Sequence, residues 1–128
     1  MILLTVDEVI ALHAKLTKVS GGSCELRDRG LLESAVYASE ASFGDEEIYP
    51  TIIEKSARLA YALISNHAFV DGNKRIGVLI MLMTLKLNDV SLTYTQQELI
   101  ALGLGSASGK LEYEDILAWI RQHIVSEA

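Results

Sequence analysis

The sequence predicts an all-α protein, a bundle of about six helices in one domain that spans residues 1–128. Three observations indicate this class. Helix-start patterns recur along the chain, apolar residues follow them at helical spacing, and convincing strand patterns are scarce. Half of the 128 residues are hydrophobic, with only two Phe and one Trp, so we expect a single core built mainly from aliphatic side chains.

Three helix starts share the pattern Thr-x-x-Glu. In such a capping box the Thr oxygen accepts a hydrogen bond from an unpaired backbone N–H, and the Glu carboxylate accepts one from the N–H of the Thr. The pairs are Thr5 with Glu8, Thr51 with Glu54, and Thr95 with Glu98. Apolar residues follow each pair at a spacing of three or four, which predicts three amphipathic helices.

Further helices are expected over about 28–41, from the end of the motif near Asn73 to about Leu87, and over about 113–125. The first half of the helix that starts near Asn73 is apolar on every side. A helix of that kind lies in the centre of a bundle. The helix before it should end near Asn66, so two central helices would flank the segment between them.

Breaks between the helices are predicted at Gly21-Gly22, 42–50, 88–94 and 103–110. The segment 42–50 contains few helix formers, and its Tyr49 precedes a proline and should be extended. We expect a short hairpin or flap there, and no strand elsewhere.

Composition excludes several classes of protein. The net charge of −6 argues against general nucleic-acid binding. The longest apolar run has eight residues, Ile76 to Met83, whereas a membrane span needs about twenty. A single cysteine, Cys24, excludes an internal disulfide framework. We therefore expect a cytoplasmic protein that contacts neither membrane nor nucleic acid directly.

The one net-positive segment, 66–86, contains the stretch HAFVDGNKR at residues 67–75. Its Gly72 permits a turn at a helix start, where unpaired backbone N–H groups bind phosphate oxygens readily. Arg75 and Lys74 would add charge against a polyphosphate. Asp71 is the hard oxygen ligand that Mg²⁺ prefers, and His67 can take a proton near neutral pH. Taken singly, each residue also suits an ordinary loop; it is the combination that indicates chemistry.

This stretch resembles the signature of the Fic/Doc (Fido) family, which reads His-x-Phe-x-Asp/Glu-Gly-Asn-x-Arg. The likeness extends to VDEVIALHAKL at 6–16 and to RDRGLLESAV at 27–36, and is strongest in the death-on-curing (Doc) branch of the family. The resemblance implies the Fido fold, in which the active loop joins two central helices.

The resemblance also implies roles for individual residues. His67 would be the general base that deprotonates a hydroxyl of a target protein, and Asp71 would hold Mg²⁺. Phe69 would anchor the loop, and 42–50 would be a flap that aligns a target peptide. The phosphates of ATP would be bound by Gly72, Asn73, Lys74 and Arg75.

Two positions depart from the AMP-transferring members, which have Gly where this chain has Lys74 and a second Arg where it has Val78. The Doc branch shares the Lys and phosphorylates elongation factor Tu, which arrests translation. The resemblance therefore favours a toxin of a toxin–antitoxin module that transfers phosphate from ATP to a hydroxyl of such a translation factor. AMP transfer to a protein hydroxyl, or an inactive module that only binds an antitoxin, are the alternatives.

Three other features of the sequence do not point to a second site. The stretch 103–110, GLGSASGK, lacks the spacing of a P-loop and is predicted to be a helix-ending loop. His13 and His123 lie far from the motif in sequence and are interpreted as structural or surface residues. The inhibitory Ser/Thr-x-x-x-Glu-Gly/Asn pattern of many Fic enzymes is not completed at Ser42 or Ser108. We therefore expect inhibition by a separate antitoxin whose tail folds on binding.

Overall fold

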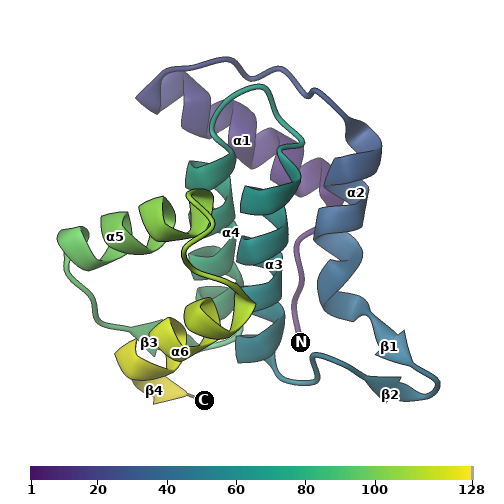
Figure 1. The fold of residues 1–128 in the computed structure, drawn as a ribbon, viewed down its shortest axis with the longest axis vertical. Coiled ribbons are helices and arrows are strands. Elements are labelled where there is room, and N and C mark those ends of the chain that lie inside the picture. Colours follow the sequence, from purple (N-terminus) through teal and green to yellow (C-terminus); the bar gives the residue numbers. More distant parts are fainter. Residues whose placement is uncertain (128) are drawn as a thin grey trace.

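The computed structural model describes residues 1–127. Over these residues the chain forms six α-helices and two small two-stranded sheets, which confirms the all-α prediction (Figure 1). The helices are α1 (Val6–Ser20), α2 (Arg29–Tyr37), α3 (Ile52–Asn66), α4 (Asn73–Leu87), α5 (Gln96–Ala107) and α6 (Tyr113–His123). The strands are β1 (Ser42–Phe43), β2 (Glu46–Glu47), β3 (Val90–Leu92) and β4 (Ile124–Glu127).

All three predicted capping boxes are present. The Thr oxygens accept from the backbone N–H groups of Glu8, Glu54 and Glu98 at 3.2, 3.1 and 3.1 Å. Each Glu carboxylate in turn accepts from the N–H of its Thr. These caps satisfy backbone groups that have no partner within the helix, and they set the first residues of α1, α3 and α5.

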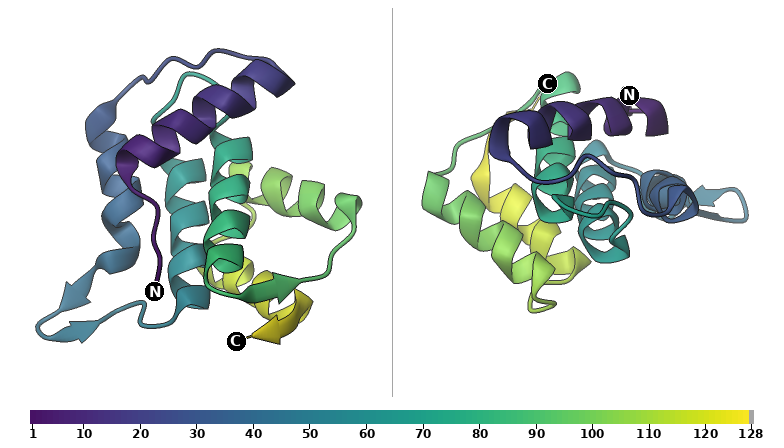
Figure 2. Two further views of the ribbon diagram at one scale, coloured as in Figure 1. Left: turned by 180° about the vertical axis from the view of Figure 1, so that it is seen from behind. Right: turned by 90° about the horizontal axis from the view of Figure 1, so that it is seen from above.

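The helices α3 and α4 lie side by side at the centre, with α2 on one side and α5 and α6 on the other, and α1 crosses one face of the central pair (Figures 1 and 2). The core is divided accordingly. Leu32, Leu63 and Ile80 are fully buried in the half formed with α1 and α2. Met81 and Ile116 are fully buried in the half formed with α5 and α6. Both halves share α4, as its uniformly apolar sequence predicted.

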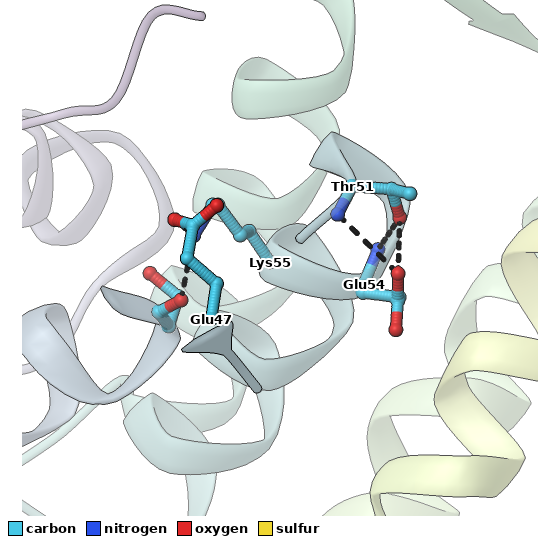
Figure 3. Close-up of polar contacts among 5 residues, drawn as sticks. Glu47, Thr51, Glu54 and Lys55 are labelled. Carbon is cyan, nitrogen blue, oxygen red and sulfur yellow. Dashed lines mark hydrogen bonds and ion pairs between the residues drawn. The ribbon is translucent and has the colours of Figure 1, made fainter. Parts of the chain in front are cut away.

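The predicted hairpin at 42–50 is confirmed as β1 and β2, which pair antiparallel. It is fixed by Lys55 of α3, whose side chain is 3% exposed (Figure 3). The Lys55 Nζ donates to the carbonyl oxygen of Ser39 at 3.0 Å and to Glu47 Oε1 at 2.9 Å. A buried ammonium needs such partners, so the hairpin cannot move away from α3 without leaving a charge unpaired.

The position of this hairpin differs from that of the flap expected beside the motif. It precedes the N-terminal end of α3, whereas His67 follows the C-terminal end (Figure 1). The 15 residues of α3 rise 1.5 Å each, which separates the two ends by about 22 Å. The structure therefore does not support alignment of a target peptide at His67 by these strands.

Three boundary predictions were wrong. The helix expected over 113–125 ends at His123, and Ile124–Glu127 pairs with Val90–Leu92 as a second sheet where no strand was expected. Ile124 and Val125 are β-branched and suit a strand as well as a helix, which conceals the switch. The segment 103–110 is helical as far as Ala107, since Gly103 and Gly105 allow close contacts of α5 rather than ending it. The helix expected over 28–41 tightens into a 3₁₀ turn at Ala38–Glu40.

No helix within the described residues is long and apolar enough to cross a membrane.

We predict that Gly77→Ala destabilises the protein. A Cβ at Gly77 would lie 2.6 Å from Ile64 Cγ1 and 3.2 Å from the carbonyl oxygen of Ala60, so α3 and α4 would have to separate. Overpacking of this kind costs about 1–3 kcal/mol, which exceeds the gain in helix propensity of about 1 kcal/mol. Urea unfolding should show a net loss of stability. The control is Gly103→Ala, where the Cβ would meet the flexible Lys74 side chain at 3.2 Å and Val78 Cγ2 at an ordinary contact distance of 3.7 Å. Equal effects of the two substitutions would contradict the prediction.

A second prediction concerns pH and the ion pair between α5 and α6. His123 Nε2 lies 2.6 Å from Glu98 Oε2, and His123 Nδ1 lies 2.6 Å from the carbonyl oxygen of Trp119. The hydrogen bond to Glu98 raises the pKa of His123 above 6.5, and its counterpart lowers the pKa of Glu98 from 4.5 to about 2.

The pair should stabilise the fold fully between pH 4.5 and pH 6.5, the ordinary pKa values of Glu98 and His123. Its contribution falls as rising pH deprotonates His123, and as falling pH below 4.5 protonates Glu98. Thermal unfolding of the wild type and of His123→Gln should therefore differ most near about pH 5.5 and least near about pH 9. A difference that is constant with pH would show that the pair is not charged.

Candidate active site

The segment between α3 and α4 is held in an unusual backbone conformation at both ends. His67 ends α3 with φ 50° and ψ 48°, and Gly72 precedes α4 with φ 78° and ψ 16°. Both residues have a left-handed backbone conformation. Glycine adopts this conformation without a steric penalty, whereas for a histidine it costs about 1 kcal/mol or more of conformational energy. A strained non-glycine residue persists only where its surroundings impose the conformation, and such residues are common at functional sites.

Asn73 holds this segment together from within. Its Oδ1 accepts from the backbone N–H of Phe69 at 3.0 Å, and its Nδ2 donates to the carbonyl oxygen of Phe69 at 2.9 Å. The amide thus makes both hydrogen bonds that a neighbouring strand would make. The Asn73 side chain is therefore committed to the loop, and the backbone N–H of Asn73 is the part suited to an anion.

His13 of α1 supports the segment from below. Its ring stacks on Phe69 with centroids 3.6 Å apart, and its Nε2 lies 2.7 Å from the carbonyl oxygen of Asp71. A carbonyl only accepts, so Nε2 carries the proton. Burial lowers the pKa of His13, and the nearby Arg75 acts in the same direction, against the hydrogen bond to the Asp71 carbonyl oxygen and the charge of the Asp71 carboxylate. His13 is therefore a buried structural residue, as interpreted from the sequence, and it contacts the motif directly.

A second segment that the sequence did not associate with the motif lies alongside it. Leu26 and Phe69 form an antiparallel bridge, with the Arg27 N–H donating to Ala68 O at 2.8 Å and the Val70 N–H to Glu25 O at 3.0 Å. Segment 25–28 therefore pairs with the loop through this single bridge, and its residues carry no strand pattern that would have predicted it.

The charged side chains of the motif lie on different sides of the loop. Asp71 is exposed, and its Oδ2 accepts from the Ser23 N–H at 3.0 Å. The Arg75 guanidinium donates to Ser20 Oγ and, at 3.0 Å, to the carbonyl oxygen of Gly21. Lys74 extends the other way, with its aliphatic part against Gly103 of α5. The connection from α1 to α2 therefore covers the Asp71 and Arg75 side of the motif.

The predicted site residues meet at one cavity of about 300 Å³. Its lining comprises Ile64, His67, Val70, Asp71, Gly72, Asn73, Lys74, Arg75 and Ala107. The structure therefore brings all six predicted site residues together, and it adds Ala107, at the end of α5, which sequence reasoning missed. His67 presents an exposed side chain here. A separate apolar groove of about 460 Å³ between α1, α4 and α5 also borders Lys74 and Arg75. Val78 lines this groove and does not line the cavity that contains His67.

The start of α4 suits an anion. Gly72 provides no side-chain cap for α4. The first backbone hydrogen bond of the helix runs from the Ile76 N–H to the Gly72 carbonyl oxygen at 2.9 Å. The N–H groups of Asn73, Lys74 and Arg75 precede that bond at the positive end of the helix dipole.

The site also suits Mg²⁺ held jointly with phosphates. Within the described residues no three His, Cys, Asp or Glu side chains gather as a metal cage. Mg²⁺ is commonly bound by one or two carboxylates together with water and substrate phosphates, and the single exposed carboxylate of Asp71 fits that mode.

Comparison with known proteins agrees with this fold. The profile of the Fic/DOC family matches residues 3–85, which is more than half of the chain and includes the whole motif. The protein belongs to this family. Its sequence is also 46% identical over 55 residues to a protein of Mycolicibacterium smegmatis described as Toxin Doc. That match covers 43% of this chain and 42% of the relative.

We predict that Asn73→Ala loosens the loop and destabilises the fold. Two hydrogen bonds to the Phe69 backbone would be lost, at a net cost of about 1–3 kcal/mol, and Phe69 amide exchange should accelerate. Urea unfolding and hydrogen exchange are the measurements. The control, Asn66→Ala, removes one bond from Asn66 Nδ2 to the Leu31 carbonyl oxygen and should cost about half as much. Unchanged exchange at Phe69 would show that the amide does not hold the loop.

Proposed function

We propose that this protein is the toxin of a toxin–antitoxin module and transfers the γ-phosphoryl group of ATP to a hydroxyl of a target protein. The observation that carries the proposal is the cavity that joins an exposed His67 to Asp71, Lys74 and the start of α4. It combines a base, a metal ligand and an anion site within one space. The relative described as Toxin Doc supports the toxin part of the proposal.

In this proposal each element has one task. The His67 imidazole accepts the proton of the attacking hydroxyl. The N–H groups at the start of α4, with the Lys74 ammonium, bind the phosphate oxygens and stabilise charge that spreads over them during transfer. Mg²⁺ bound at Asp71 would neutralise phosphate charge. Because the loop is already fixed by Asn73 and His13, these groups need little rearrangement when the nucleotide binds.

The choice of phosphoryl over AMP transfer rests on two side chains. Lys74 lines the cavity, and its bulk and charge would alter the nucleotide pose used by members with Gly at this position. Val78 lines the apolar groove and offers no cation for a distant phosphate. A nucleotide bound the opposite way round would place its γ-phosphorus next to the hydroxyl that His67 activates.

The proposed target is a translation factor similar to elongation factor Tu, and its modification would arrest translation in the cytoplasm. The proposed partner is an antitoxin whose tail folds on binding. The groove beside Lys74 suits an amphipathic helix, because Ile100 and Leu104 are 51% and 54% exposed along one rim. AMP transfer and a purely antitoxin-binding module are the alternatives.

The test is transfer of label from ATP to protein in a cell extract, with ATP labelled at either the α or the γ phosphorus. Label from γ alone is expected, and His67→Ala should reduce it by about 10²–10⁴ while retaining the fold. Label from α alone would establish AMP transfer instead. Label from neither, together with growth that continues when the protein is expressed without a partner, would establish a binding module.

For the metal, we predict that Asp71→Asn raises the Mg²⁺ concentration required for transfer. The amide keeps the shape of the side chain and can still accept from the Ser23 N–H, but it lacks the charge that a divalent cation prefers. Transfer rates measured across a Mg²⁺ titration should show the shift. An identical Mg²⁺ requirement in a folded variant would give Asp71 another role.

A further inference from the structure

The Arg27 side chain contacts the backbone of His67. Both its Nε, at 2.8 Å, and its Nη2 donate to the carbonyl oxygen of His67. The two donors of one planar group therefore converge on a single acceptor. That acceptor belongs to the residue with the strained left-handed backbone.

The Arg27 side chain is itself held in place by its backbone. The N–H groups of Arg27 and Asp28 both donate to the carbonyl oxygen of Ala68, at 2.8 and 3.0 Å. Segment 25–28 thus binds the carbonyl of Ala68 through its backbone and the carbonyl of His67 through a side chain. Two consecutive peptide groups of the loop are fixed from one short segment.

The orientation of a peptide group determines where the adjoining side chains project. The two carbonyls fixed by segment 25–28 define the backbone on the C-terminal side of His67, and α3 defines it on the N-terminal side. The imidazole itself is exposed, so the backbone, rather than burial, gives it a direction.

We propose that Arg27 is a positioning residue for His67. By holding the His67 carbonyl, it keeps the residue left-handed and directs the imidazole into the cavity beside Asp71. The inference rests on the proposed function of His67 as the base, because only then does the direction of the ring affect a rate. Misplacement of a reacting group by about 1 Å can cost as much as 100-fold in rate.

The chain offers a matched control two residues away. Arg29 is also an exposed arginine, but its guanidinium pairs with Asp7 at 3.3 Å and with Glu33 at 3.0 Å, away from the loop. Arg27→Met and Arg29→Met remove the same charge and the same donors at positions two residues apart. Only the first removes a contact with His67.

The experiment measures three quantities in both variants: the backbone ¹³Cα and ¹³Cβ resonances of His67, the rate of transfer, and the KM for ATP. Arg27→Met should shift the His67 resonances and lower kcat by about 10–100-fold, with KM changed less than about twofold. Arg29→Met should change none of them. Arg27→Lys keeps the charge and a single donor, so it should recover part of kcat; it also replaces Arg27→Met if that variant does not fold.

The outcomes separate the two proposals. A folded Arg27 variant with unchanged His67 resonances, or with kcat within about twofold of the wild type, would overturn the positioning role. So would equal losses in Arg27→Met and Arg29→Met. A wild type that transfers no label would refute the proposed function, while the His67 resonances would still decide whether Arg27 sets the backbone there.

Discussion

The arrangement of the site depends on the pair of hydrogen bonds between the Asn73 side chain and the Phe69 backbone. These bonds close a short turn between two residues with left-handed backbone, His67 after α3 and Gly72 before α4. Phe69 is 2% exposed and is covered by the stacked ring of His13. The loop is consequently attached to the core at its centre, while its two ends carry the groups that face the cavity.

This design explains how the helices are used. The close approach of α3 and α4 at Gly77 brings their adjoining ends together, so a loop of six residues spans the gap. α1 contributes His13 beneath the loop, and its C-terminal end accepts from Arg75. α5 contributes Ala107 to the lining of the cavity. Helices from both halves of the core thus contribute to one cavity, although the motif itself occupies a single short stretch.

The sequence was most informative where interactions are local. Capping boxes involve residues three apart, and the first residues of α1, α3 and α5 follow from them. The motif likewise placed His67 and Asp71 near each other without any tertiary information. The pairing of β3 with β4, the contact of His13 with Asp71 and the bridge of Leu26 with Phe69 join residues far apart in sequence. Neither propensity nor spacing specifies such partners, because the same residues suit other environments equally well.

The separation between the β1–β2 hairpin and the cavity has a practical consequence. The tip of this hairpin is exposed, with Phe43 at 85%, and Gly44 has open space where a side chain would be added. Exposed loop tips tolerate inserted residues far better than packed segments. Lys55 fixes the base of the hairpin, so an insertion at Gly44 would leave the strands and α3 in place. A fluorophore or affinity tag at that tip would report on the molecule from the end opposite its chemistry.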